Sequence, residues 1–457
     1  MEVKLLATRV ILVRHGESTF NVEGRVQGHL DESTLTAQGW ADARRVGEVL
    51  KDISFDAIYC SPLQRAGQTA ATIQQVIAAD SPSPVPQVQV LDQLIEIGLP
   101  LWEGMLFEQV KIDFPEQYQC WNSAPEQLCM ELSGPDGIQS FYPVPVLYEQ
   151  AQALWQHILP RHTDQTILLV GHSGINRALL STALGLTPDR YQRLQQANCN
   201  ISVLNFPAGL TQKPQLETLN VTDHLGLPIP NWWRHYRGLR LILVRHGETD
   251  WNRCGQFQGQ IDVPLNDNGR QQGQQAAAFL QEIPLDFAIS SSLARPRETA
   301  ELILKHHPHV QLDLSDPLWE ISHGTWEGQF EPDIEAQYPG ELERWRTTPE
   351  LVQMPEGENL QQVWDRAIAA WDEIVATALA TGKTEQTGLV VAHDAINKVV
   401  LCHVAGLGLE HFWCFKQGNG AVSVIDFDVE GKPILQAMNI TTHLAGGILD
   451  RTAAGAL

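Results

Sequence analysis

The chain has 457 residues, of which 43% are hydrophobic and 19% charged, and its formal net charge at pH 7 is −23. This is the composition of an ordinary globular protein, without the run of about 18 apolar residues that a membrane-spanning helix requires. The strong negative charge argues against nucleic acid as a partner, because the phosphates of a nucleic acid would be repelled.

Strand-like and helix-like segments alternate through the first half of the chain. Continuous apolar runs such as residues 10–13 suit parallel strands that are covered on both faces. In chain order the expected elements are a strand at 10–13, a helix at 37–50, a strand at 55–61, helices at 66–79 and 149–158, a strand at 166–171 and a helix at 176–184.

The second half repeats this order. Its expected elements are a strand at 241–244, a helix at 268–280, a strand at 287–291, helices at 298–306 and 360–380, a strand at 388–392 and a helix at 397–405. Alternating strands and helices predict α/β domains with a mainly parallel sheet. We therefore expect two tandem domains, each with three α/β/α layers.

The two halves also share residues at matching places. Arg14-His15-Gly16 ends the first strand of one half, and Arg245-His246-Gly247 ends the first strand of the other. Further matched segments are Gly24–Gly28 with Gly255–Gly259, Ser61–Arg65 with Ser291–Arg295, Glu96–Gly104 with Glu320–Gly328, and Gly171–Arg177 with Ala392–Lys398. Self-similarity with a domain-sized period indicates a duplicated domain, not a solenoid.

Each half is long enough to bury a hydrophobic core of its own. We expect the first domain at residues 1–226 and the second at 239–457. Between them, prolines and a glycine interrupt any regular element, so a linker is expected at 227–238. The adjacent Trp232 and Trp233 suggest that this linker docks on a surface.

Three chemically capable residues of the first half follow the carboxyl ends of predicted strands. His15, Arg65 and His172 occupy these places. Ligands of open α/β sheets bind at this edge, so residues far apart in the chain are expected to converge there. The second half repeats the arrangement, with the set His246, Arg295 and His393.

At these residues the chain resembles the histidine phosphatase superfamily, in its phosphoglycerate-mutase-like branch. The resemblance rests on the Arg-His-Gly-Glu start, the Ser-x-Leu-x-Arg segment, the glutamate followed by Trp-Glu-Gly, and the second histidine. It covers nearly the whole chain, once per half, and implies two phosphoglycerate-mutase-like domains. The tandem layout resembles that of a sugar-acid phosphatase of photosynthetic organisms.

The resemblance implies a catalytic role for both histidines of each half. His15 and His246 would act as nucleophiles that accept the phosphoryl group on a neutral imidazole nitrogen before water removes it. His172 and His393 would donate hydrogen bonds to the phosphoryl group and stabilise its charge.

Arginines and amides would bind the phosphate. Arg14, Arg65, Arg245 and Arg295 are expected to grip its oxygens, because a guanidinium fork matches phosphate geometry and stays charged. Polar positions that line the family's pocket are matched by Asn21, Gln27, Asn252 and Gln258. With cations supplied by side chains, no metal and no other cofactor is expected.

Glu96 and Glu320 would serve first as general acid and then as general base. A carboxyl group that protonates an ester oxygen near pH 7 needs a raised pKa, which burial normally supplies. The flanking residues Ile95, Ile97 and Ile321 could form the apolar surroundings.

Each half also departs from the family pattern. In the second half, Asp394 follows the second histidine where the family usually has glycine, and an acid near phosphate would repel it unless turned away. The second half has a Glu-Gly-Glu-Asn segment at 356–359 that has no clear counterpart in the first half. The residue of the first half that corresponds to Arg366 is Gln150. Both halves are expected to bind phosphate, and turnover in both stays open.

The expected function is metal-independent phosphomonoester hydrolysis through a phosphohistidine intermediate, on a small phosphorylated metabolite such as a sugar-acid phosphate. A cofactor-dependent phosphoglycerate mutase, a phosphoserine phosphatase and a phospho-ligand sensor with one inactive domain remain alternatives. The retained Glu96 and Glu320 speak against a sensor, since binding phosphate requires no proton donor.

Two further expectations concern compartment and partners. Seven scattered cysteines without Cys-x-x-Cys spacing favour reduced thiols, and the N-terminus shows no secretory signal pattern. We therefore expect a cytoplasmic or organelle-stroma protein that binds a small phosphorylated metabolite, with neither nucleic acid nor membrane as partner. The sequence leaves its oligomeric state open.

Overall fold

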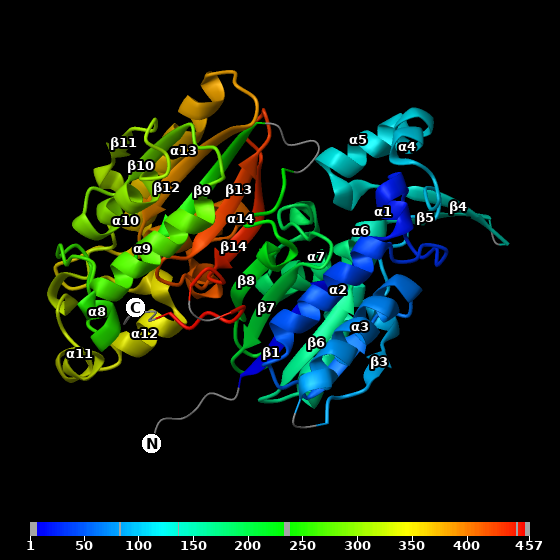
Figure 1. The fold of residues 1–457 in the computed structure, drawn as a ribbon, viewed down its shortest axis with the longest axis horizontal. Helices are drawn as coiled ribbons and strands as arrows, with labels where there is room; N and C mark the ends of the chain where they lie inside the picture. Colours follow the sequence, from blue (N-terminus) through cyan, green and yellow to red (C-terminus); the bar gives the residue numbers. More distant parts are fainter. Residues whose placement is uncertain (1–6, 82–83, 136, 233–237, 445–446, 453–457) are drawn as a thin grey trace. The chain divides into compact units, whose positions relative to one another are not determined.

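The computed structural model describes residues 7–81, 84–135, 137–232, 238–444 and 447–452. The chain divides into two compact units. The first unit comprises Met1–Leu216 and Asn220–Leu227, and the second comprises Glu217–Leu219 and Pro228–Leu457. Figure 1 shows the elements of both units in sequence colours.

A sheet forms the middle layer of the first unit. Its strand β1 (Thr8–Arg14) pairs in parallel with β6 (Thr166–Gly171) and antiparallel with β7 (Ile201–Phe206). Strand β2 (Ala57–Cys60) pairs in parallel with both β6 and β3 (Val88–Val90), and β8 (Gln215–Val221) lies beside β7. The apolar residues of β1 are fully buried, as expected for a strand covered on both faces.

Two pairs of α-helices flank this sheet. Helix α2 (Ala37–Leu50) packs against α3 (Gln64–Asp80), and α6 (Pro143–Ile158) packs against α7 (Ser173–Leu184). The shorter helices are α1 (Thr19–Glu23), α4 (Phe107–Asp113) and α5 (Pro115–Ser123).

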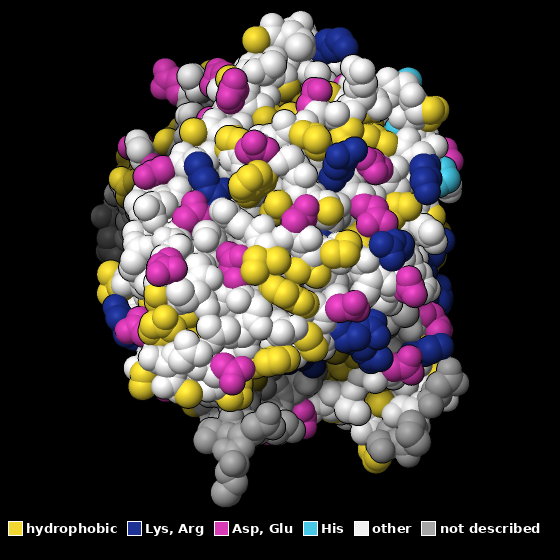
Figure 2. All heavy atoms as spheres, turned by 90° about the vertical axis from the view of Figure 1, so that its left-hand side faces the viewer, with side chains coloured by type: hydrophobic (Ala, Val, Ile, Leu, Met, Phe, Trp, Pro, Cys, Tyr) yellow, Lys and Arg dark blue, Asp and Glu magenta, His cyan; other side chains and the backbone are white. Residues whose placement is uncertain are grey.

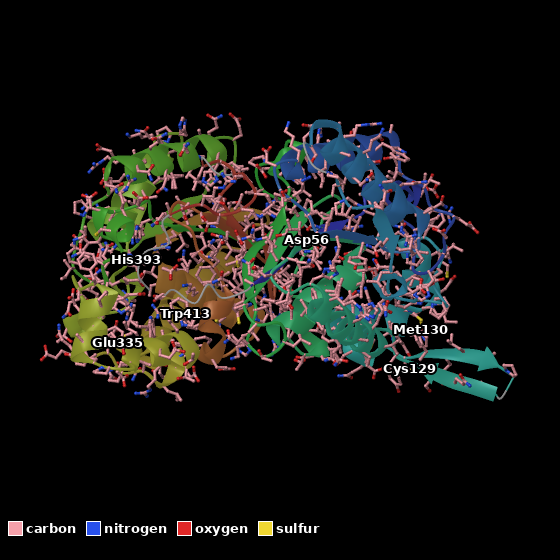
Figure 3. All side chains as sticks on the ribbon, turned by 90° about the horizontal axis from the view of Figure 1, so that it is seen from below. Asp56, Cys129, Met130, Glu335, His393 and Trp413 are labelled. Atoms are coloured by element: carbon pink, nitrogen blue, oxygen red, sulfur yellow. The ribbon has the colours of Figure 1, made fainter. Side chains whose placement is uncertain are left out.

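A β-hairpin precedes α6 in the first unit. It consists of the antiparallel strands β4 (Met130–Gly134) and β5 (Gly137–Phe141). The hairpin extends away from the rest of its unit, with the labels of Cys129 and Met130 marking its base (Figure 3). In the second unit the corresponding place, before α13, is occupied by the Glu-Gly-Glu-Asn segment at 356–359.

The second unit has the same architecture. Strand β9 (Leu239–Arg245) pairs in parallel with β12 (Gln386–Ala392) and antiparallel with β13 (Val422–Phe427). Strand β12 pairs in parallel with β10 (Phe287–Ser290). The outer strands are β11 (Leu312–Leu314), parallel to β10, and β14 (Pro433–Ile440), antiparallel to β13.

Two helix pairs again flank the sheet. Helix α9 (Asp267–Leu280) packs against α10 (Ala294–Leu304), and α13 (Leu360–Ala380) packs against α14 (Asp394–Ala405). The shorter helices are α8 (Asp250–Cys254), α11 (Glu331–Gln337) and α12 (Glu341–Thr347). None of the helices in the described part of the chain combines the length and apolar character needed to cross a lipid bilayer.

The predicted fold class is confirmed: each unit is a three-layer α/β domain whose sheet is mainly parallel. Several helices begin earlier than predicted. Helix α6 starts at Pro143, not at residue 149, because proline is tolerated in a first helical turn, where its missing N–H is not needed. Helices α7 and α14 each start directly after a histidine, three residues before the predicted position. The antiparallel strands that follow them were not predicted.

The predicted linker at 227–238 lies partly outside the described residues, which omit Trp233 and the four residues after it. In the described part, the Arg240 guanidinium lies 4.5 Å from the ring centroid of Trp232 and donates to the Pro230 carbonyl at 2.9 Å. Arg240 also forms a buried two-bond ion pair with Asp426, at 2.6 and 2.7 Å. Within the second unit, the segment before β9 is therefore held against strands β9 and β13 of the sheet.

Candidate active site

In the first unit, parallel pairing brings the ends of three strands together. Arg14 lies opposite Gly171 across the pair β1–β6, and Cys60 lies opposite Val170 across the pair β2–β6. The residue after each strand end therefore points into the same region. There the ring centroids of His15 and His172 are 5.1 Å apart.

The second unit repeats this convergence. Arg245 lies opposite Ala392, and Ser290 lies opposite Val391. The ring centroids of His246 and His393 are 5.2 Å apart. We call Arg14, His15, Arg65, Glu96 and His172 the first site, and Arg245, His246, Arg295, Glu320 and His393 the second site.

The histidine after each first strand has a defined tautomer. Nδ1 of His15 lies 2.7 Å from the Gly16 carbonyl oxygen, and Nδ1 of His246 lies 2.7 Å from the Gly247 oxygen. A carbonyl oxygen can only accept, so Nδ1 carries the proton and Nε2 keeps its lone pair. Burial, followed by the charges of neighbouring arginines, holds the pKa of both imidazoles well below the ordinary value. Each ring is therefore neutral at pH 7, with an unprotonated Nε2.

The second histidine of each site is buried, and only one of its two ring nitrogens has a hydrogen-bond partner among the described residues. Nε2 of His172 lies 2.7 Å from the Ser61 hydroxyl oxygen, and Nε2 of His393 lies 2.9 Å from that of Ser291. Among the described residues, neither Nδ1 atom has a hydrogen-bond partner. A buried nitrogen without a partner costs free energy, and an anion between the rings would satisfy it.

Backbone carbonyls position the arginines. Arg65 donates to the oxygens of Leu30 and Gly28 at 3.1 and 3.0 Å. Arg295 makes the matching bonds to Ile261 and Gly259 at 3.2 and 2.7 Å.

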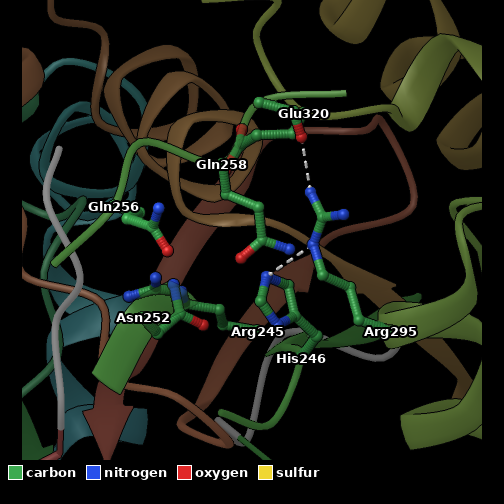
Figure 4. Close-up of a pocket in the computed structure, with 8 residues that line it drawn as sticks. Arg245, His246, Asn252, Gln256, Gln258, Arg295 and Glu320 are labelled. Atoms are coloured by element: carbon green, nitrogen blue, oxygen red, sulfur yellow. Dashed lines mark hydrogen bonds between the residues drawn. The ribbon is translucent and has the colours of Figure 1, made fainter. Parts of the chain in front are cut away.

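In the second site, a guanidinium group also contacts the histidine. Nε of Arg295 donates to Nε2 of His246 at 3.3 Å, as the dashed line in Figure 4 shows. Burial lowers the pKa of Arg295 to about 10, so the group stays charged near neutrality. In the first site, Arg14 donates to the Gln196 oxygen at 2.8 Å, while its Nε and that of Arg65 have no partner among the described residues.

The glutamates lie at helix N-termini. The Glu96 carboxylate accepts from the backbone N–H groups of Gly174 and Ile175 in the first turn of α7, both at 3.1 Å. Glu320 accepts from the N–H of Ala395 in the first turn of α14, at 3.2 and 3.4 Å. Glu320 is 5% exposed, and burial is the largest cause that raises its pKa.

The predicted amides belong to a network beside each histidine. Ser18 is the N-cap of α1, and the Asn21 side chain accepts from the Ser18 backbone N–H and from the Asn198 amide, both at 3.1 Å. Gln27 accepts from the Ser18 hydroxyl. Asn252 and Gln258 occupy the same places in the second unit. Gln258, with its oxygen turned towards Arg295, accepts from Nη1 at 3.1 Å and shares the single Nε–H of Arg295 with His246, at 2.9 Å from the Gln258 oxygen.

In the second unit the structure brings most of the predicted residues into one pocket. It is lined by Arg245, His246, Asn252, Gln256, Gln258, Gly259, Arg295 and Glu320 (Figure 4). Figure 2 shows basic and acidic side chains interspersed over the face of the molecule that it presents, without a large field of one charge. The second site's cations are instead internal, since Arg245 and Arg295 are each 1% exposed.

Several supporting residues were missed at the sequence level. Glu327 of the Trp-Glu-Gly segment accepts from the N–H groups of Gln260 and Ile261 at 3.0 Å each, and so shapes the loop that carries Gln258. Glu103 accepts from the His29 N–H in the first unit. Both glutamates stand in a segment that occurs twice, and that repetition was the available signal.

Asp394, which raised a doubt about the second half, is 2% exposed. Its Oδ1 lies 3.2 Å from Nη1 of Arg245, and its Oδ2 lies 2.6 Å from Nζ of Lys398. The side chain thus points to two cations within its own unit. Among the described residues, no group of three or more His, Cys, Asp or Glu side chains is placed to hold a metal ion.

Comparisons with known proteins agree with this geometry. The model of the histidine phosphatase superfamily (branch 1) matches residues 10–222 and 241–441. A 2-carboxy-D-arabinitol-1-phosphatase of Triticum aestivum is 30% identical, over 96% of this chain and 87% of its own length. A probable 2-carboxy-D-arabinitol-1-phosphatase of Arabidopsis thaliana is 29% identical, over 95% of this chain and 88% of its own.

A single-domain relative matches as well. Phosphoserine phosphatase 1 of Hydrogenobacter thermophilus is 32% identical, over 45% of this chain and 94% of its own length. The family model covers both repeats, including both Arg-His-Gly segments. The chain therefore belongs to the histidine phosphatase superfamily, branch 1, and is a phosphoric monoester hydrolase.

Proposed function

We propose that each of the two domains, at residues 1–226 and 239–457, hydrolyses a small phosphorylated metabolite through a phosphohistidine. The observation that carries the proposal is the pair of neutral imidazoles, His15 and His246, each with a lone pair on Nε2 and with buried arginines nearby. Hydrolysis of a phosphomonoester needs a nucleophile, neutralised charge and a proton for the leaving oxygen. The arrangement offers all three.

In the first step, Nε2 of His15 or His246 attacks phosphorus in line with the ester oxygen. An N–P bond forms and the P–O bond breaks, while Glu96 or Glu320 gives its proton to the leaving oxygen. In the second step, water attacks phosphorus, the same carboxylate takes the proton of that water, and the N–P bond breaks. Inorganic phosphate leaves and the imidazole is neutral again.

The equatorial oxygens of phosphorus gain charge during both steps. Arg14 with Arg65, or Arg245 with Arg295, would bind them through charge-assisted hydrogen bonds. Nδ1 of His172 or His393 would donate to the same oxygens, which is supported by its lack of any other partner among the described residues. The amides Asn21 and Gln27, with Asn252 and Gln258, would orient the remaining polar atoms. The cations on this route are arginine side chains, so we propose that neither metal nor other cofactor is needed.

We propose a sugar-acid phosphate as substrate. The support is the pair of two-domain relatives named as 2-carboxy-D-arabinitol-1-phosphatases, each matching at least 95% of this chain. Phosphoserine is the second candidate, because the relative named phosphoserine phosphatase 1 is 32% identical to one half. We also propose a cytosolic or stromal location, supported by the absence of any disulfide among the seven cysteines, all of which lie in the described residues.

The decisive experiment measures phosphate release from a chromogenic phosphomonoester in the presence of a chelator. We would compare the unaltered protein with His15→Ala, His246→Ala and the double variant. We expect partial activity in each single variant and none in the double variant, together with an acid-labile phosphoprotein in rapidly quenched samples. The matched control is His306→Ala, an exposed histidine beyond the end of α10.

Activity that survives in the double variant would refute the nucleophile assignment. A screen of phosphorylated metabolites by kcat/KM then separates a sugar-acid phosphate from phosphoserine. Transfer of the phosphoryl group to phosphoglycerate instead of water would identify a mutase. Phosphate binding without any release from either site would identify a sensor.

A further inference from the structure

The two sites differ in charge at one buried position. Asp394 is the first residue of α14, and its carboxylate bridges Arg245 of the second site and Lys398 one helical turn later. All three side chains are buried, with exposures of 2%, 1% and 5%. The Lys398 ammonium lies 4.2 Å from the ring centroid of Trp413, which holds it in place. Figure 3 labels Trp413 and also His393, the residue before Asp394 in the chain.

The first site has a neutral residue at the same position. Ser173 is the first residue of α7 and directly follows His172, as Asp394 follows His393. The residue that corresponds to Lys398 is Arg177, which donates to the Gln195 side chain at 2.6 Å. Arg14 donates to the backbone oxygen of Gln196. Its counterpart Arg245 donates to the backbone oxygen of Gln417 and also forms an ion pair with the Asp394 carboxylate.

A carboxylate at this distance affects any anion that Arg245 would bind. It pairs with Nη1 of Arg245, which also donates to the Gln417 oxygen, and so neutralises part of the charge that would attract phosphate. It also repels the phosphate directly, because its own charge is buried. Lys398 offsets part of this repulsion. One unit charge about 6 Å away, at an effective dielectric constant near 20, changes affinity on the order of a hundredfold, so partial compensation leaves roughly tenfold.

We propose that Asp394 is a positioning residue that weakens phosphate binding at the second site through its ion pair with Arg245. The protein then carries one site of high phosphate affinity and one of low affinity. The first site would work at low substrate concentration and be inhibited readily by its product, phosphate. The second would continue at higher substrate and phosphate concentrations. This inference rests on the proposed function, since it assumes that both sites accept phosphate.

Asp394 also acts on the acid group of the second site. Glu320 accepts from the N–H of Ala395, the next residue, so the two carboxyl groups belong to the same helix start. Asp394 is the second cause, after burial, that raises the pKa of Glu320. The other charged or titratable groups around Glu320 are Arg245, His246, Arg295, Glu358, Arg366, His393 and Lys398. Removing the charge of Asp394 should therefore tighten phosphate binding and also favour ionised Glu320.

The test uses the full chain with one working site at a time. His15→Ala leaves the second site, and His246→Ala leaves the first. For each we would measure inhibition by inorganic phosphate, together with KM and kcat for a chromogenic phosphomonoester. We expect the second site to have a phosphate inhibition constant roughly tenfold above that of the first. Adding Asp394→Asn should remove most of this difference and lower KM.

The same variant separates a charge effect from structural damage. Measured with an alkyl phosphate, whose leaving oxygen needs a proton, Asp394→Asn should move the alkaline decline of kcat to lower pH, whereas damage would raise KM and leave the pH profile unchanged. The matched control is Asp372→Asn, which removes an exposed carboxylate that pairs with His403 near the far end of α14. This control should change neither the phosphate inhibition constant nor KM by more than about twofold.

The reciprocal variant tests the proposal independently, in case Asp394→Asn does not fold. Ser173→Asp, in the chain that keeps only the first site, should weaken phosphate inhibition roughly tenfold. Unchanged phosphate constants in both variants, with unchanged thermal unfolding, would overturn the proposal. If neither site released phosphate, the proposed function would fail. Calorimetric titration with inorganic phosphate would still show whether the second site binds phosphate more weakly than the first, and whether Asp394→Asn removes that difference. Failure to bind phosphate at either site would overturn both.

Discussion

The loops that carry Glu96 and Glu320 are held by different side chains. In the second unit, Arg366 of α13 donates to the backbone oxygens of Pro317, Trp319 and Glu320 and forms a two-bond ion pair with Glu358. In the first unit, Gln150 of α6 donates to the oxygens of Gln93 and Ile95, at 2.9 Å each. The same loop is thus supported once by a cation and once by a neutral amide.

A second support differs in the same way. His29 lies 2.8 Å from the Glu96 carbonyl oxygen, and Gln260 donates to the Glu320 oxygen at 3.1 Å. The residues proposed to touch phosphate are the same in both units, whereas those behind them vary. A carbonyl oxygen accepts equally from an amide, an imidazole or a guanidinium, so loop support tolerates exchange that phosphate chemistry does not.

The largest effect is expected from removing the acid. In single-site chains, Glu320→Gln and Glu96→Gln should each lower kcat by about 10²- to 10⁴-fold for an alkyl phosphate, whose leaving oxygen needs a proton. The loss should be much smaller for a nitrophenyl ester, which leaves without one. Equal losses for the two esters would argue against proton donation.

The pH dependence sharpens the same comparison. Glu320 must be protonated to act as acid, and burial raises its pKa. The activity of the second site should therefore persist above the ordinary pKa of a carboxyl group and decline as pH rises through the raised value. In Glu320→Gln this decline should disappear from the profile of kcat for the alkyl phosphate.

A medium effect is expected from the loop supports. Arg366→Gln should destabilise the protein by about 2 kcal/mol, because it removes a partly buried ion pair and hydrogen bonds to backbone oxygens. Gln150→Ala should cost about 1 kcal/mol. Urea unfolding measures both, with Arg344→Gln as control, since the exposed pair of Arg344 with Glu341 contributes little. An Arg366 variant as stable as this control would show that the loop holds without its cation.

The smallest effect concerns a buried imidazole behind the second site. Both ring nitrogens of His323 lack partners among the described residues, and the ring packs against Phe257 and Trp345. The first unit has Leu99 at the same place, three residues after its glutamate. His323→Leu should therefore stabilise the protein by about 1 kcal/mol at pH 7.

The stabilisation by His323→Leu should become larger as the pH falls below 7. Burial lowers the pKa of His323 to about 3, against 6.5 in an unfolded chain. Below pH 6.5 the unfolded state binds a proton that the folded state refuses, so the unaltered protein loses stability as pH falls towards 3. The leucine variant lacks this loss. Thermal unfolding between pH 7 and 5 checks the prediction, and a constant difference across that range would contradict it.

Much of the fold can be read from the chain because it depends on local pattern. Apolar runs such as 10–13 and 241–244 are typical of strands inside a sheet that is covered on both faces. The repeat of Arg-His-Gly indicates two domains. The convergence of His15, Arg65 and His172 also follows, since parallel strands end at one edge. The antiparallel hairpin β4–β5 was not predicted because both strands are short and mostly exposed, and Gly137–Phe141 shows no clear alternation of apolar and polar side chains.

The partners of the charged groups depend on packing between distant segments. The chain next to Asp394 indicates an acid close to phosphate, but only the fold shows which cations partly offset its charge, namely Arg245 and Lys398. Gln150 suggested a lost arginine, yet its amide reaches two carbonyl oxygens of the Glu96 loop. Residue types along a strand or helix reveal which face is buried, whereas a side chain's counter-charge is set by which segment the fold brings within about 3 Å of it.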